Sequence, residues 1–177
     1  MLERGDFARL IYDASFKSGE FTLRSGEISH EYWDKYKLFQ PDFLPAICNE
    51  LSNIIPDSTQ VLAGAELGGA MLTTALSYRT GIPAAYLRKE KKRYGTRNIR
   101  EGADIQSKDV CIVEDIVTTG VTIVETADKL RKLDANVDSA ICVILRDPLA
   151  IENIESAGIK LQYLFTAEEL KQFHAAI

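Results

Sequence analysis

The sequence predicts an α/β fold in which a central parallel sheet is flanked by helices. From about residue 61 onward, short apolar runs of strand type alternate with segments of helical periodicity. Such alternation is typical of parallel strands joined by helical crossovers on both faces of a sheet. Two strand-to-helix junctions, at Gly68-Gly69 and at Thr118-Thr119-Gly120, also carry small and hydroxyl residues where open sheets bind ligands.

The N-terminal segment, about residues 1–55, breaks this alternation. Apolar spacing, Gly19, the Ser25-Gly26 turn signal and two prolines delimit its expected elements. These are a helix over 3–18, strands over 21–24 and 32–38, and a helix from Pro41 to just before Pro56. We expect this segment to form a hood over the carboxyl edge of the sheet, within a single domain of residues 1–177.

The core, about residues 56–177, follows in regular order. Gly81 and Gly158 end two of its helices. Strands are expected at 61–63, 84–87, 110–113, 140–145 and 161–164, and helices at 68–80, 121–133 and 149–157, with a short one at the C-terminus. Between the second and third strands, residues 88–108 form a charged stretch that is too long for a plain connection.

Composition excludes several classes of protein. The formal net charge of −5 and the pI of about 5.1 argue against a general nucleic-acid or anionic-membrane surface. Three widely spaced cysteines give neither a zinc pattern nor a disulfide framework. The sequence shows no signal peptide and no apolar stretch long enough to span a membrane, so we expect a cytoplasmic protein without nucleic-acid or membrane partners.

The junction over residues 109–122 carries the clearest chemistry. An apolar run ends at Glu114 and Asp115, and a hydroxyl-rich turn then leads through Gly120 into a helix. The free N–H groups of such a turn and the helix dipole favour a phosphate. Because no Lys follows the glycine, a polyphosphate-binding Walker loop is excluded. Paired acids before a phosphate cradle suit a sugar phosphate, although an ordinary turn with solvated acids is the plain alternative.

A basic run over residues 88–100 contains seven cationic side chains. Basic runs are commonly solvated faces, but this one lies between two core strands. We interpret about 88–103 as a mobile lid that closes over an anionic leaving group. Gly68 and Gly69 allow the backbone to approach an anion, or serve as a tight turn chosen for packing alone.

These motifs together resemble a known family. The run Glu114-Asp115-Ile116-Val117-Thr118-Thr119-Gly120-Val121-Thr122 is similar to the phosphoribosyl-pyrophosphate (PRPP) motif of type I phosphoribosyltransferases. Residues 19–35, residues 88–102, the Glu66–Gly69 turn and the tail over 157–170 resemble the orotate phosphoribosyltransferases. The resemblance implies the type I phosphoribosyltransferase fold and transfer of ribose 5-phosphate from PRPP to orotate, in the biosynthesis of UMP.

The resemblance also implies site residues. It assigns catalytic roles to Lys89, Lys92 and Asp115. It assigns PRPP binding to Arg24, Gly68, Gly69, Arg88, Lys89, Lys92, Tyr94, Glu114, Asp115, Ile116, Val117, Thr118, Thr119, Gly120, Val121 and Thr122. It assigns orotate binding to Arg24, Tyr32, Trp33, Thr118 and Arg146. Mg²⁺ would be held through PRPP and waters rather than by the protein directly, and a homodimer would share lid residues across its interface.

Three positions depart from the family pattern. Tyr94 stands where a histidine is common, Arg24 replaces a lysine, and Leu145 precedes Arg146 where an acid is usual. These departures leave open a sister transferase for another nucleobase, a non-catalytic PRPP-sensing regulator and an inactive paralogue. From the residues alone, two aromatics on a strand such as Tyr32-Trp33 are more often part of the core. A strand-end arginine such as Arg146 is a structural ion pair about as often as it is a ligand contact.

Overall fold

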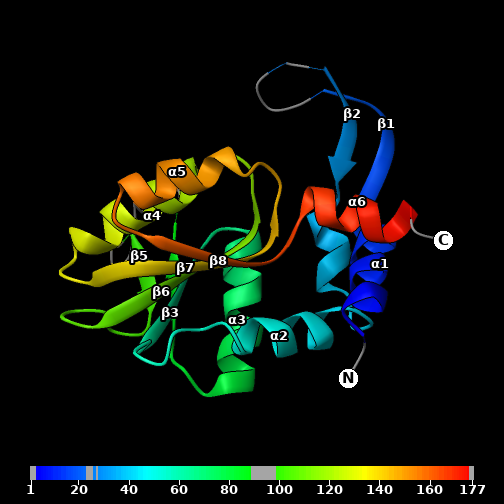
Figure 1. The fold of residues 1–177 in the computed structure, drawn as a ribbon. Helices are drawn as coiled ribbons and strands as arrows, with labels where there is room; N and C mark the ends of the chain where they lie inside the picture. The colour runs from blue at the N-terminus through cyan, green and yellow to red at the C-terminus, as the bar shows by residue number, and fades with distance from the viewer. Residues whose placement is uncertain (1–2, 23–25, 27, 89–98, 176–177) are drawn as a thin grey trace.

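The computed structural model describes residues 3–22, 26, 28–88 and 99–175 (Figure 1). Its helices are α1 (Arg4–Ser15), α2 (Leu44–Ser52), α3 (Gly68–Thr80), α4 (Val121–Arg131), α5 (Leu149–Ser156) and α6 (Ala167–Ala175), with a 3-10 helix η1 (Lys35–Phe39). Its strands are β1 (Phe16–Thr22), β2 (Ile28–Trp33), β3 (Val61–Ala65), β4 (Ala84–Leu87), β5 (Arg100–Gly102), β6 (Asp109–Val117), β7 (Asn136–Leu145) and β8 (Lys160–Thr166). None of the helices in these ranges has the length and apolarity needed to cross a membrane.

The central sheet has the strand order β5-β4-β3-β6-β7-β8. All neighbouring strands run parallel except β5, which is antiparallel to β4. Helices α4 and α5 cover one face, and α2 and α3 cover the other (Figure 1). The predicted parallel α/β sheet is therefore confirmed. The charged stretch over 88–108, for which the sequence predicted no particular element, contributes the three-residue edge strand β5.

Both faces of the sheet are packed, and alternate residues of each strand serve the two cores. In β6, Cys111 and Val113 belong to the core that contains Leu72 of α3. Val110 and Ile112 belong to the core on the α4 and α5 side. A strand that buries both faces reads as a continuous apolar run, which is why β6 was recognisable in the sequence.

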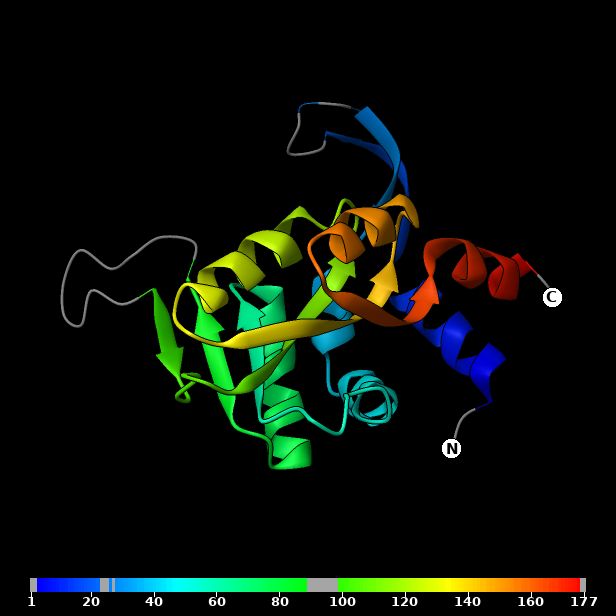
Figure 2. The same cartoon turned by 60° about the vertical axis from the view of Figure 1, so that its left-hand side comes forward.

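The N-terminal elements stand beside the sheet. Helix α1 packs against α6, and the antiparallel β1–β2 hairpin projects away from the sheet (Figures 1 and 2). The expected helix over 3–18 is too long: the chain becomes extended at Phe16, and Gly19 lies within β1. Phe16 pairs with Trp33 in the hairpin and stacks on Tyr12, so its packing draws it into the strand. The expected strand over 32–38 ends at Trp33 and is followed by η1.

Candidate functional site

Glu114 and Asp115 lie within β6 and not in the loop after it. The strand continues to Val117, and Glu114 pairs with Cys142 of β7. The expected strand end at Val113 was therefore wrong, because the apolar residues beyond the acids continue the ladder with β7. On its other side, β6 pairs with β3 only as far as Val113. Beyond that residue the edge of β6 is free of β3, and the two acids lie at this opening.

The two carboxylates are almost fully buried. Asp115 is 1% exposed and Glu114 is 8% exposed. The N–H of Ile116 donates to Oδ1 of Asp115 at 2.6 Å, and Nζ of Lys35 lies 3.0 Å from Oδ2 of Asp115. Burial, followed by the charge of Asp115, raises the pKa of Glu114 to about 8. Near neutral pH, Glu114 therefore carries a proton.

The N-terminus of α3 meets this acidic pair through glycines. A Cβ on Gly68 would lie 1.6 Å from Oδ2 of Asp115, and one on Gly69 would lie 2.8 Å from the carbonyl oxygen of Val113. Only residues without a side chain fit this approach. The positive end of the α3 dipole stabilises a negative charge at this place. The structure thus brings the two junctions identified in the sequence into one site.

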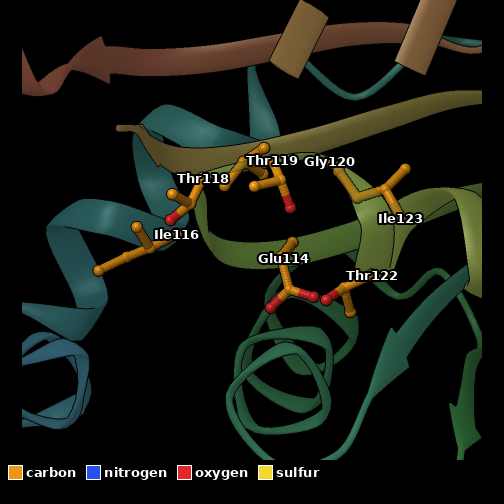
Figure 3. A pocket seen from close by; sticks show the side chains of 8 residues that line it. Glu114, Ile116, Thr118, Thr119, Gly120, Thr122 and Ile123 are labelled. Carbon is orange, nitrogen blue, oxygen red and sulfur yellow. The ribbon is translucent and has the colours of Figure 1, made fainter. Parts of the chain in front are cut away.

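A pocket of about 120 Å³ opens beside Glu114 at the N-terminus of α4 (Figure 3). Its lining consists of Glu114, Ile116, Val117, Thr118, Thr119, Gly120, Thr122 and Ile123. The carboxylate of Glu114 and the hydroxyl of Thr122 point toward each other (Figure 3). Gly120 precedes the helix with φ 77°, and a Cβ there would lie 2.6 Å from Cγ1 of Ile154. This turn, with α4 behind it, has the size, hydroxyls and helix dipole of a phosphate cradle.

Neighbouring elements hold the cradle in place. Nδ2 of Asn153, on α5, donates to the carbonyl oxygen of Thr119 at 2.8 Å. The N–H of Arg146 donates to the carbonyl oxygen of Val117 at 2.7 Å. Arg146 is half-buried and follows β7 at the carboxyl edge, so it lies beside the cradle as the sequence predicted. Leu145, the residue that departs from the family pattern, is fully buried in the core on the α4 and α5 side.

The remaining predicted site residues differ in their burial, and some lie outside the described part of the chain. Arg88 directly follows β4 and is half-buried, and its N–H donates to the carbonyl oxygen of Ile99 at 2.9 Å. Tyr32 is 37% exposed and stacks on Phe21. Trp33 is 5% exposed and packs against Tyr12 and Phe16, so its expected role in covering a base is corrected to one in the core. Arg24, Lys89, Lys92 and Tyr94 lie outside the described residues.

Two side chains at the site had no predicted role. Lys35 follows the aromatic pair in a segment that resembles the family, yet only the fold shows that it reaches Asp115. Asn153 is one of several polar residues on an exposed helix, and nothing in the sequence distinguishes it.

Comparison with known proteins agrees with this geometry. The model of the phosphoribosyl transferase domain family matches residues 43–160, which is more than half of the chain. An orotate phosphoribosyltransferase of Nocardioides sp. is 39% identical over 155 residues, covering 86% of each chain. One of Methanopyrus kandleri is 34% identical over 173 residues, covering 97% of this chain and 93% of the relative.

Solved structures show the same fold. Orotate phosphoribosyltransferase of Mycobacterium tuberculosis in complex with Fe(III) dicitrate aligns with a TM-score of 0.80 and 26% identity, covering 94% of this chain and 98% of that one. The complex of the same enzyme with PRPP aligns with a TM-score of 0.75 and 24% identity, covering 95% and 98%.

Proposed function

The chain belongs to the phosphoribosyl transferase family, and from this membership we infer that it is an orotate phosphoribosyltransferase. It transfers ribose 5-phosphate from PRPP to N1 of orotate, giving orotidine 5′-monophosphate and pyrophosphate in pyrimidine biosynthesis. The observation that carries this function is the identity with orotate phosphoribosyltransferases over nearly the full length of both chains. The acidic pair beside a phosphate cradle is the site at which PRPP binds.

The parts of PRPP are distributed over the site by their chemistry. The turn from Thr118 to Thr122 takes the 5-phosphate through its hydroxyls and N–H groups. Asp115 accepts hydrogen bonds from ribose hydroxyls, and Glu114, which is protonated near neutral pH, both donates and accepts. The Gly68-Gly69 backbone and Arg88 take the pyrophosphate. Val121 is the first residue of α4, so its backbone N–H has no partner within the helix and can contribute to phosphate binding.

The reaction needs positioning and charge stabilisation rather than a protein nucleophile. As the glycosidic bond to pyrophosphate breaks, positive charge develops on the ribose ring and negative charge on the leaving group. Asp115 is placed to favour the positive ring, and Lys89 and Lys92, assigned from the sequence alone, neutralise pyrophosphate. Fixed charges of this kind act most strongly in a site that excludes water.

Orotate is a planar anion, and a cation at the carboxyl edge of β7 suits it. Arg146 presents a planar fork that binds a carboxylate with two hydrogen bonds. Arg24 and Thr118 are the further proposed contacts, and the partly exposed ring of Tyr32 offers a surface for stacking. Leu145 fills the core in place of an acid, so Arg146 keeps its position without that neighbour.

Mg²⁺ is proposed as the cofactor. The site fits a hard cation, because Glu114 lines the phosphate cradle and Asp115 follows it in β6, and magnesium prefers oxygen ligands and retains several waters. When bound, Mg²⁺ would neutralise the pyrophosphate charge. The residues that would face its water shell are those two acids.

A homodimer is proposed on the exposed face of α3. Leu67, Met71, Thr74 and Tyr78 recur at helical spacing, and we call them the α3 stripe. Tyr78 is 94% exposed and Leu67 is 58% exposed, next to the proposed pyrophosphate site. In this homodimer, lid residues from about 88–103 would be shared across the interface, as the resemblance implies. We further propose that residues 1–55 act as a hood within a single domain, supported by the contact of Lys35 with Asp115.

A cytoplasmic location is proposed as well. Cys48, Cys111 and Cys142 are free and buried, which suits a compartment that keeps thiols reduced.

The function is tested by following orotate absorbance with PRPP and Mg²⁺. Wild type should consume orotate only when PRPP is present, and should not use uracil or hypoxanthine. Arg146→Ala should lower kcat/KM for orotate by about 100-fold, as expected for loss of a charge-assisted bidentate contact. Arg9→Ala, which removes an exposed cation paired with Asp6 on α1, is the matched control. PRPP binding without turnover of orotate would instead indicate a sister transferase or a PRPP sensor.

A further inference from the structure

The N-terminal segment touches the acidic pair through the side chain of Lys35. This residue begins η1 and is separated from the end of β2 by Asp34 alone. Its ammonium lies 3.0 Å from Oδ2 and 3.4 Å from Oδ1 of Asp115. It also lies 3.4 Å from the position that a Cβ on Gly68 would take. Lys35 therefore sits where the hairpin, β6 and the start of α3 meet.

The charges in this cluster depend on one another. The Asp115 carboxylate is buried, and a buried charge without a partner is strongly destabilising. Burial opposes the charged form of Lys35, but the charge and hydrogen bond of Asp115 outweigh it and raise the pKa of Lys35 above its usual value. The ring of Tyr36 lies 5.9 Å from the ammonium. Lys35 thus stays charged beside the acidic pair.

The geometry also fixes the direction of the Asp115 carboxylate. Its Oδ1 accepts from the N–H of Ile116, and its Oδ2 faces Lys35 and the backbone of Gly68. Without the ammonium, Oδ2 would lose its cation and the carboxylate would be free to rotate. Such a rotation would move the oxygens that are proposed to receive the ribose hydroxyls.

We propose that Lys35 is a positioning residue for phosphoribosyl transfer, which holds the carboxylate of Asp115 in the orientation needed to bind the ribose of PRPP. This inference rests on the proposed function. Lys35 acts through Asp115 and does not itself contact the substrates. The N-terminal hairpin is thereby coupled to the PRPP site, in addition to any part it has in covering orotate.

The test compares Lys35→Met, which keeps the length of the side chain, with Lys35→Arg, which keeps the charge. Lys35→Met should raise the Kd for PRPP, measured by calorimetry, and the KM for PRPP, each about tenfold. This is the lower end of the loss seen when a group that orients a ligating side chain is removed. KM for orotate should not change, and Lys35→Arg should restore PRPP binding to within about threefold of wild type. Lys17→Met is the matched control, because Lys17 pairs with Asp34 on the same hairpin without reaching the acids.

A double variant separates positioning from folding. In an Asp115→Asn background, Lys35→Met leaves no buried charge unpaired, and it should have no further effect on Kd for PRPP. An equal loss in that background, or unchanged PRPP binding in Lys35→Met alone, would overturn the inference. Neither result would touch the proposed function, which fails only if wild type does not convert orotate with PRPP.

Discussion

The backbone of Gly68 lies so close to the carboxylate of Asp115 that no side chain fits between them. A Cβ at position 68 would lie 1.6 Å from Oδ2 and 2.7 Å from Cγ of Asp115. The first residue of α3 and the buried acid of β6 are therefore in direct contact, although they are far apart in the sequence. This contact therefore fixes the position of the turn proposed to bind pyrophosphate relative to the acids proposed to bind ribose.

Substitution of Gly68 should disrupt both parts at once. Gly68→Ala forces the carboxylate of Asp115 to move, which we expect to lower the free energy of unfolding by roughly 1–3 kcal/mol, as for overpacked sites. The affinity for PRPP should fall at least about tenfold, since a misplaced group in a preorganised site has such effects. Chemical denaturation and calorimetry measure the two quantities.

Gly5→Ala provides the comparison for that prediction. Gly5 lies in α1, where a Cβ would be 3.5 Å from Cδ1 of Phe173, an ordinary contact. Alanine in a helix is more favourable than glycine by up to about 1 kcal/mol, so this variant should be as stable as wild type or slightly more so. If both variants bind PRPP like wild type, the close approach of Gly68 to Asp115 is not needed for function.

Glu114 should make the protein less stable as pH rises. Its pKa is raised from 4.5 to about 8 in the folded state, so between these values the folded state binds more protons than the unfolded state. The contribution of Glu114 is therefore complete below pH 4.5 and is lost as pH rises through about 8. Glu114→Gln should remove this slope. Thermal unfolding of both proteins across this pH window measures it, and parallel curves would contradict the assignment.

The sequence predicted the sheet well because apolar runs that bury both faces have a distinct pattern. The bounds of α3 and β4 were predicted as they stand, since Gly81 ends α3 in the left-handed conformation and Pro83 precedes β4. Strand β6 was cut short at the acids, because carboxylates are normally a signal to leave a sheet. Their burial depends on Lys35 and on the α3 N-terminus, which are contacts that no local pattern contains.

Parts of the candidate site that lie within one continuous segment could be predicted from the sequence. Parts that depend on a residue from another element could not. The cradle from Thr118 to Thr122 is one continuous segment, and it was recognised as such. Trp33 was assigned to the base because of the resemblance, whereas its packing against Tyr12 and Phe16 depends on the β1–β2 register. Asn153 is on α5, which is separated from the cradle by α4 and β7 in the chain. Its hydrogen bond to Thr119 therefore depends on tertiary packing.

Asn153 should contribute to PRPP binding although it lies outside the cradle. Asn153→Ala removes the hydrogen bond to the carbonyl oxygen of Thr119, which is worth about 0.5–1.5 kcal/mol net. Because the bond fixes the cradle, we expect KM for PRPP to rise roughly threefold to tenfold, with kcat little changed. Asn136→Ala is the control. Asn136, the first residue of β7, also donates an exposed hydrogen bond, to the side chain of Asp109. Equal KM values in the two variants would exclude the positioning role.

The α3 stripe should determine the oligomeric state. Met71→Glu combined with Tyr78→Glu places two charges on an exposed apolar face without touching Leu72 or Leu76 in the core beneath. If two copies meet there, light scattering should show a change from twice the chain mass to the monomer mass of 19.7 kDa.

The same variant tests whether the site needs both copies. If lid residues are shared across the interface, kcat should fall by at least about tenfold when the subunits separate, because cations that neutralise the leaving group are lost. Leu149→Glu, which changes another exposed apolar residue, at the start of α5, should alter neither mass nor turnover. A monomeric variant with full activity would show that each chain completes its own site, and a monomeric wild type would remove the stripe as an interface.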